Sequence, residues 1–198
     1  MQISWFGYSA FRIQNDGTTV ITDPSDAGMN FSISKHQADI VVCSTGDIST
    51  DPIGGKPFII TTPGEYEVKS VFVHGIRSNA STIYLITVDD IGIAFMGHAK
   101  FSELSEKHLE VMEGADILLM PVGGGSASSA KDAVRIINQI EPRIVVPSYY
   151  RISGSKGLDS VEVFLKEYQA AREETEKLKV NKKDLMQEDT RVVILKKT

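Results

Sequence analysis

The sequence predicts an α/β (α+β) domain in which two mixed sheets face each other and helices lie outside them. Two observations predict it. The first half of the chain consists of short alternating runs separated by turn residues, which is typical of strands joined as hairpins. The second half changes to helical spacing with fully apolar runs between the helical segments, as expected of buried strands in a layered fold. No linker-like composition interrupts the chain, so residues 1–198 are expected to form a single domain.

The strands of the first half are expected to form a meander of hairpins. Asn15-Asp16-Gly17 is a strong turn signal between two of them, and Asp89-Asp90 turns a later pair. Cys43 ends one apolar run and is interpreted as a buried small hydrophobe rather than a nucleophile. The predicted strands cover residues 3–6, 10–13, 18–21, 39–43, 57–60, 70–74, 82–86 and 91–96.

Three helices and three strands are expected in the second half. Ser129 with Asp132 three residues later resembles a capping box, and Asp159 is expected to cap the last helix. The charged stretch 162–183 mixes both signs and indicates a solvated helix face followed by a turn. The predicted helices cover residues 102–113, 129–140 and 160–172, and the predicted strands cover 116–120, 143–147 and 190–195.

Composition and charge exclude several classes of function. The net charge of −5 and a pI near 5.4 argue against sequence-independent binding of nucleic acid. The longest apolar runs, such as Ile117–Val122, are far shorter than the ~20 residues of a membrane helix. The N-terminus has no basic segment followed by an apolar one, and the single cysteine fits a reducing compartment. We therefore expect a cytoplasmic protein with neither nucleic acid nor membrane as a partner.

Several segments in a fixed order resemble the metallo-β-lactamase superfamily, specifically its small, lactonase-like branch of metal-dependent hydrolases. The resemblance extends from about Gln2 to the final strand, and its specificity lies in the combination of segments. It implies a four-layer αββα sandwich with the site along one edge where the two sheets meet. The segments that carry it are residues 5–11 (WFGYSAF), 22–24 (TDP), 38–44 (ADIVVCS), 63–68 (PGEYEV), 116–124 (DILLMPVGG) and 144–147 (IVVP).

The chain departs from this family at the metal-ligand motifs. Active members carry H-x-H-x-D-H directly after the strand that ends at Ser44, whereas this chain has TGDIST at 45–50. The family's H-L-G-D segment corresponds to FMGH at 95–98, and its P-x-H-Y segment corresponds to PSYY at 147–150. Many members also have a histidine where Tyr8 stands.

These changes remove the donors that a metal centre needs. Zinc takes three or more nitrogen, sulfur or carboxylate ligands, and neutral hydroxyls are poor substitutes. Of the corresponding positions, Asp47 and His98 alone retain plausible ligands. The resemblance implies zinc in relatives, but here we expect no metal and no other cofactor. Without a metal, the chain lacks the usual means of lowering the pKa of water towards ~7.

The resemblance implies that Asp47 and His98 point into one groove, because the corresponding family ligands reach the same metal centre. Two interpretations stay open for this pair: a residual site or acid–base dyad, or a hydrogen-bonded pair that fills the vacated space. In the alternative arrangement, His98 turns outward and Asp47 caps a nearby backbone N–H. The predicted vestigial site consists of Asp47, His98 and Tyr149, and the predicted pocket residues are Tyr8, Thr45, Ser49, Thr50, Gly124 and Arg151.

The glycine-rich segment 123–126 also allows two interpretations. Its backbone N–H groups would suit an anion, with Arg151 adding positive charge at the rim. However, the segment lacks the spacing and the lysine of a P-loop, which favours a tight turn between strand and helix.

Three functional hypotheses follow. The first is a hydrolase-fold protein that has lost catalysis and acts by binding a small ligand or a protein partner. The second is a hydrolase of lactones, esters or phosphodiesters with a relocated or metal-free site that uses Asp47, His98 and Tyr149. The third is a structural subunit of a homo-oligomer. Retained framework segments combined with changed ligand positions favour the first hypothesis over the second.

Overall fold

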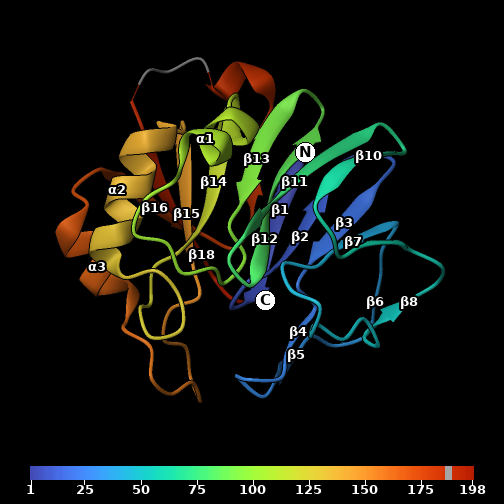
Figure 1. Ribbon diagram of the computed structural model, residues 1–198, viewed down its shortest axis with the longest axis horizontal. Helices are drawn as coiled ribbons and strands as arrows, with labels where there is room; N and C mark the ends of the chain where they lie inside the picture. The colour runs from blue at the N-terminus through green and yellow to red at the C-terminus, as the bar shows by residue number, and fades with distance from the viewer. Residues whose placement is uncertain (186–188) are drawn as a thin grey trace.

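Two sheets face each other in the computed structural model, which describes residues 1–185 and 189–198 (Figure 1). The six-stranded sheet has the order β17-β1-β2-β3-β7-β9, and the eight-stranded sheet has the order β10-β11-β12-β13-β14-β15-β18-β16. The first comprises β1 (Gln2–Gly7), β2 (Ala10–Gln14), β3 (Thr19–Thr22), β7 (Ile40–Val42), β9 (Phe58–Ile60) and β17 (Leu178–Lys179). The second comprises β10 (Gly64–Val68), β11 (Val71–Ser78), β12 (Ser81–Val88), β13 (Ile91–Phe95), β14 (Ala115–Pro121), β15 (Ile144–Ser148), β16 (Ala171–Thr175) and β18 (Arg191–Leu195).

The remaining elements are helices and two small sheets. The α-helices of the described residues are α1 (Glu106–Met112), α2 (Ala130–Ile140) and α3 (Val161–Glu167), and a 3₁₀ turn, η1, covers Lys182–Leu185. The small sheets pair β4 (Ser25–Asp26) with β5 (Phe31–Ser32), and β6 (His36–Gln37) with β8 (Ile53–Gly54).

The two predicted hairpin turns are confirmed, but the expected meander is wrong for part of the first half, because β7 pairs in parallel with both β3 and β9. Strands β2 and β3 pair antiparallel across the turn at residues 15–17, and β12 pairs antiparallel with β13. The Asn15 side chain accepts hydrogen bonds from the N–H groups of Gly17 (3.1 Å) and Thr18 (2.8 Å), which fixes the first turn. Asp89 and Asp90 both adopt positive φ (52° and 62°), as a tight hairpin turn requires.

Parallel strands lie next to one another in both sheets. Strands β3, β7 and β9 run parallel in the first sheet, and β13, β14, β15 and β18 run parallel in the second. The loops that follow parallel strands leave a sheet at the same edge, and ligands of α/β proteins bind there. The fold therefore brings the segments after β3, β7, β13, β14 and β15 towards one end of the molecule.

The main core lies between the two sheets, because side chains alternate along each strand. Trp5 and Phe11 point into this core, whereas Phe6 and Ile21 point to the opposite side of the six-stranded sheet. Ile33 packs against that opposite side, from the segment between β3 and β9. The predicted α/β sandwich is confirmed, but this segment with its small sheets covers the six-stranded sheet where the resemblance implied helices.

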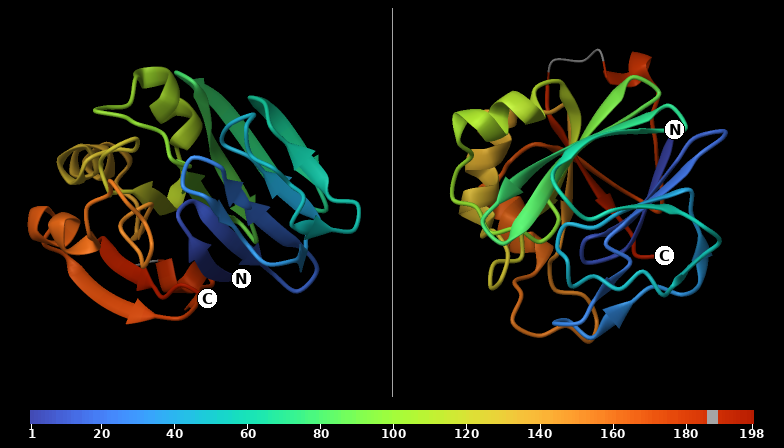
Figure 2. Two further views of the ribbon diagram at one scale, coloured as in Figure 1. Left: turned by 90° about the horizontal axis from the view of Figure 1, so that it is seen from below. Right: turned by 45° about the vertical axis from the view of Figure 1, so that its right-hand side comes forward.

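All three α-helices belong to the eight-stranded side (Figure 2). Helix α2 matches its prediction, since the Ser129 hydroxyl accepts a hydrogen bond from the Asp132 N–H (3.2 Å). Helix α1 begins later than residue 102, because Ser105 forms a capping box with His108. Helix α3 is capped at Ser160 rather than Asp159, and Ser160 makes no side-chain cap hydrogen bond.

The prediction of a solvated helix face and a turn over residues 162–183 is wrong for its second part. Helix α3 ends at Glu167, and β16 then pairs in parallel with β18 along the edge of the larger sheet. Strand β16 lies at the edge of the sheet and exposes most of its side chains. Its sequence therefore lacks the alternation of apolar and polar residues by which a strand is predicted.

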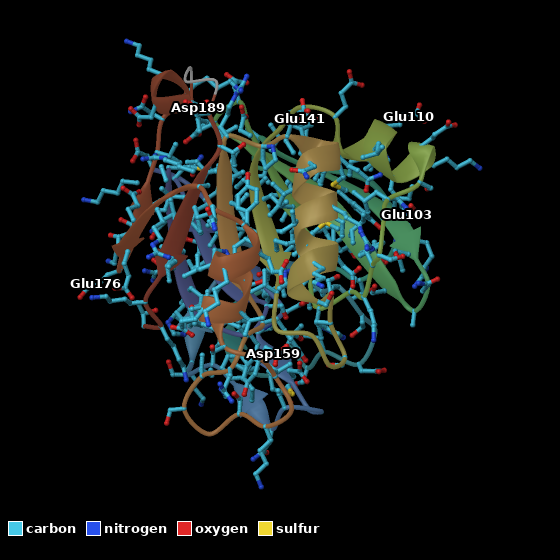
Figure 3. The ribbon with its side chains drawn as sticks, turned by 90° about the vertical axis from the view of Figure 1, so that its left-hand side faces the viewer. Glu103, Glu110, Glu141, Asp159, Glu176 and Asp189 are labelled. Atoms are coloured by element: carbon cyan, nitrogen blue, oxygen red, sulfur yellow. The ribbon has the colours of Figure 1, made fainter. Side chains whose placement is uncertain are left out.

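The helical side of the molecule carries many acidic side chains (Figure 3). The labelled ones are exposed and come from loops and helix ends as well as α1: Glu103, Glu110, Glu141, Asp159, Glu176 and Asp189. Within residues 1–185 and 189–198, no helix has both the length and the apolar character needed to cross a membrane.

Candidate functional site

A cavity of about 390 Å³ lies where loops from both sheets meet. The segments after β3 and β7 contribute one side of it, and the segments after β13, β14 and β15 contribute the other. This is the end of the molecule at which parallel strands of both sheets terminate. The residues that line the cavity are Asp26, Ala27, Gly28, Met29, Thr45, Asp47, Ile48, His98, Ser126 and Tyr149.

Tyr149 and Asp26 close this cavity through a side-chain hydrogen bond. The phenol Oη donates to Asp26 Oδ2 at 2.6 Å, and Asp26 Oδ1 accepts from the Met29 N–H at 3.0 Å. Tyr149 is 2% exposed, and burial together with the adjacent Asp26 carboxylate raises the pKa of the phenol. The phenol therefore stays protonated at neutral pH and acts as a donor that holds Asp26 in place.

A second buried carboxylate, Asp23, lies next to the residues of the β13 loop. Asp23 is 1% exposed and accepts two hydrogen bonds from Ser44, from the N–H to Oδ1 and from the hydroxyl to Oδ2, both at 2.7 Å. A Cβ at Gly97 would lie 2.4 Å from Ser44 Cβ and 3.5 Å from Asp23 Oδ2, so the loop needs glycine there. Burial raises the Asp23 pKa to about 6, although its hydrogen bonds and nearby His98 oppose this effect.

His98 and Asp47 both line the cavity, as the resemblance implied. The His98 ring stacks on Tyr149, with 5.5 Å between ring centroids and 27° between ring planes. Its Nδ1 atom is buried and makes no hydrogen bond to any described residue. Asp47 is exposed, and none of the hydrogen bonds among the described residues joins it to His98. The two residues share a cavity but do not form a directly hydrogen-bonded pair.

Some predicted pocket residues lie outside the cavity walls. Tyr8 is buried behind the wall, with its ring edge against Tyr149 at 5.4 Å between centroids. Ser49 instead anchors its own loop, because its N–H donates to Ser25 Oγ at 2.9 Å. The Thr50 carbonyl accepts from the Ile53 N–H at 2.9 Å. These residues hold the backbone around the site, whereas Thr45 does line the cavity as predicted.

The glycine-rich segment forms a turn rather than an anion cradle. The Gly124 N–H donates to the Ser128 carbonyl at 3.0 Å, and Gly124 has a φ of +65°. Arg151 is exposed, and its backbone N–H donates to the Asp159 carbonyl at 2.8 Å. Neither Gly124 nor Arg151 lines the cavity. The segment reaches the site through Ser126.

Sequence reasoning missed Asp26, Met29 and Ser126 as cavity residues. Asp26 begins a turn in which its carboxylate accepts the Met29 N–H, and the sequence D-A-G at 26–28 signals such a turn. That signal gives no indication of Tyr149, which lies 123 residues later in the chain. The pairing depends on tertiary structure and could not be inferred from local sequence.

Three residues at or beside this site have strained backbone conformations. Tyr8, Asp23 and Tyr149 all adopt positive φ (49°, 35° and 49°), a region that large side chains rarely occupy. Such conformations cost about 1–3 kcal/mol each and cluster at functional sites. Contacts with the surrounding residues must therefore offset the conformational energy that these three backbone positions cost.

The donor set does not fit the zinc centre that the resemblance implies for relatives. Within the described part of the chain, no three or more His, Cys, Asp and Glu side chains come close enough to hold a metal ion. Both Asp23 oxygens accept hydrogen bonds from Ser44, and Asp26 Oδ2 accepts one from Tyr149. His98 supplies the one imidazole of the cavity wall, and the carboxylates near it do not gather, among the described residues, into the group of three or more ligands that zinc requires.

The facing mixed sheets, with a cavity at the carboxyl ends of their strands, define an α/β protein of the metallo-β-lactamase fold. The sequence matches the beta-lactamase superfamily domain over residues 2–149. The chain therefore belongs to the metallo-β-lactamase superfamily.

Relatives with similar sequences and structures support this assignment. The chain is 27% identical to a UPF0173 protein of Pyrococcus abyssi, over 87% of this chain and 92% of the relative. It is 30% identical to a UPF0173 metal-dependent hydrolase of Staphylothermus marinus, over 50% of this chain and 41% of that protein. A crystal structure from Thermotoga maritima, assigned to the zinc-dependent hydrolases of the superfamily, superposes with a TM-score of 0.86 at 25% identity, covering 98% of both chains.

Proposed function

We propose that this chain is a member of the superfamily that has no metal centre, does not catalyse hydrolysis, and binds a small ligand in the cavity beside Tyr149. The observation that carries the proposal is the hydrogen bond from Tyr149 to Asp26. The resemblance aligns Tyr149 with a metal-binding histidine, but here the side chain at this position is a phenol that lines the cavity and donates to Asp26.

The remaining side chains offer little means of activating water. A water molecule free in solution has a pKa near 15.7, and metal-dependent hydrolases overcome this by metal coordination. Tyr149 cannot act as a base at neutral pH, because burial and Asp26 raise its pKa. The His98 ring stacks against Tyr149, and its Nδ1 atom makes no hydrogen bond to Asp47 or to any other described residue. No carboxylate therefore orients His98 as the base of an acid–base dyad. These features count against the hydrolase hypothesis.

The cavity has the properties of a ligand site. Its volume of about 390 Å³ lies within the range of about 300–1,000 Å³ that is typical of small-molecule sites. Apolar side chains, Met29 and Ile48, share the walls with the hydroxyl of Thr45 and the carboxylate of Asp47. A few polar groups among apolar ones fix the orientation of a ligand.

An activity screen tests this proposal against the hydrolase hypothesis. Purified protein is incubated with esters, lactones, β-lactams and phosphodiesters, without added metal and with Zn²⁺, Mn²⁺ or Fe²⁺. We expect no turnover above background in any condition. Turnover that Asp47→Ala or His98→Ala abolishes would contradict the proposal, and Asp51→Ala is the matched control because Asp51 follows in the same loop outside the cavity walls. Light scattering on the same sample reports whether the chain forms a homo-oligomer.

A further inference from the structure

We propose that the ligand of this cavity is a small organic cation, an alkylammonium whose nitrogen pairs with Asp26 and Asp47. This inference rests on the proposed function, because it assigns a ligand class to the same cavity.

The charge of the cavity walls carries the inference. The ten lining residues include two carboxylates, Asp26 and Asp47, and no lysine or arginine. His98 is the one lining residue that can become cationic. Even with His98 protonated, two negative charges and one positive charge leave a net charge of −1. An anion would therefore enter a negatively charged space without a guanidinium or ammonium partner in the walls.

The nearest basic residues in sequence do not change this balance. The Lys100 ammonium donates to the Gly125 carbonyl at 3.2 Å, outside the cavity walls. Arg151 is exposed and belongs to the loop after β15, also outside the walls. Asp23, buried beside Ser44, adds a third carboxylate near His98.

Asp26 is preorganised to accept a charged donor. Its two oxygens are held by the Tyr149 hydroxyl and the Met29 N–H, so binding does not need to order this side chain. A carboxylate has about four lone-pair sites, and these two bonds leave acceptor capacity for an ammonium N–H. Asp47 is exposed on a neighbouring loop and can approach the same cation from the solvent side.

The apolar part of the walls accommodates an alkyl chain. Met29 and Ile48 line the cavity together with the ring of Tyr149. A flexible thioether fills irregular gaps and adapts to different alkyl shapes. A ligand with an ammonium group and a short hydrocarbon chain would therefore satisfy both kinds of wall.

Calorimetric titration with a matched set of five-carbon compounds tests the inference: 1,5-diaminopentane, 1,5-pentanediol and glutarate. In buffer of about 0.01 M ionic strength, surface charges act over ~30 Å, so each titration is repeated at about 0.15 M. We expect saturable one-site binding of the diamine at both salt concentrations, and none of glutarate. Non-specific attraction to the exposed acids of the helical side (Figure 3) would instead disappear at the higher salt concentration.

Variants distinguish the cavity from the rest of the acidic surface. Asp47→Asn is expected to weaken diamine binding by about tenfold or more without changing the melting temperature, because Asp47 is exposed. Asp26→Asn is expected to weaken it as well, with a melting curve recorded to confirm folding. Asp51→Asn is the control, and we expect wild-type affinity.

The outcomes separate the inference from the proposed function. Binding of glutarate in preference to the diamine would overturn the inference while leaving a ligand-binding cavity intact. Diamine binding that Asp47→Asn does not weaken, or absence of diamine binding, would also overturn it. Stoichiometric metal or hydrolytic turnover would overturn the proposed function, and neither of those readouts depends on the amine.

Discussion

The Tyr149 hydroxyl donates a hydrogen bond to the Asp26 carboxylate at 2.6 Å, although the two residues are 123 positions apart in the chain. Asp26 belongs to β4, which follows β3 of the six-stranded sheet, and Tyr149 follows β15 of the eight-stranded sheet. The bond therefore connects the two halves of the sandwich at the mouth of the cavity.

Tyr149→Phe should destabilise the protein by about 1–2 kcal/mol. The substitution removes a hydrogen bond to a charged acceptor and leaves the Asp26 carboxylate with one fewer donor. The free energy of unfolding is measured by urea denaturation. Tyr168→Phe is the matched control, because Tyr168 is half-buried and its hydroxyl makes no hydrogen bond within the described residues. Equal effects of the two substitutions would show that the bond contributes nothing.

Asp23 should make the protein less stable as the pH rises from about 4 to about 6. Its pKa in the folded state is raised from 3.8 to about 6, so the folded state binds the proton more tightly than the unfolded state. Stability is therefore lost as the pH rises through this window, by an amount on the order of 2–3 kcal/mol. The difference in unfolding free energy between Asp23→Asn and wild type, measured from pH 4 to pH 7, should increase in favour of the variant.

Asp39→Asn is the control of opposite sign for this measurement. Hydrogen bonds from Lys69 and the Thr19 N–H lower the Asp39 pKa, so the ionised form stabilises the fold. That contribution is present above the unfolded-state pKa and is lost as the pH falls. The Asp39→Asn variant should therefore lose more stability relative to wild type at pH 6 than at pH 3.5. Parallel pH profiles of Asp23→Asn and wild type would refute the assignment of the Asp23 pKa.

Gly123→Ala should destabilise the site by more than about 2 kcal/mol. A Cβ at this position would lie 2.2 Å from the Tyr149 carbonyl oxygen and 2.8 Å from the Tyr150 Cα, so the backbone must move. Thermal melting of the variant should show the loss, with Gly17→Ala as the control. A Cβ at Gly17 meets no atom within 4 Å. A melting temperature within error of wild type for Gly123→Ala would contradict the close approach of these two loops.

Cys43 should resist alkylation in the native protein. The thiol is buried, and burial raises its pKa to about 12, so the reactive thiolate is scarce at neutral pH. Iodoacetamide labelling followed by intact mass should give no adduct at pH 7.5 in buffer, and a single adduct in guanidinium chloride. Rapid labelling of the folded protein would show that Cys43 is accessible.

Most strands of the two sheets in the first half and the boundaries of α2 could be predicted from the sequence, because alternation, turn residues and a serine cap are local signals. Strand β10 and the strands of the two small sheets were missed. The strand β16 could not be predicted, because its exposed charged residues follow no period and its pairing with β18 is a tertiary contact. The late start of α1 was missed because Phe101 and Leu104 are buried like residues of an apolar helix face, although they lie in the loop before Ser105, where the Phe101 N–H donates to Ser128 Oγ.

The site could be predicted in part. Thr45, Asp47, His98 and Tyr149 line the cavity because each lies just after a strand that ends at this edge of the sandwich. Ser49 does not line it, because its loop folds back onto Ser25. The contribution of the β4 turn depends on how one sheet packs on the other, and a sequence pattern carries no information about that packing.

The metal content of the purified protein tests the central claim most directly. Protein is prepared from cells grown with added Zn²⁺, Mn²⁺ and Fe²⁺, passed through a desalting column, and analysed by inductively coupled plasma mass spectrometry. The account predicts well under one equivalent of any of these metals per chain, because the described residues bring no three His, Cys, Asp or Glu side chains together around one point. One or two equivalents per chain that the Asp47→Ala or His98→Ala variant lacks would contradict it.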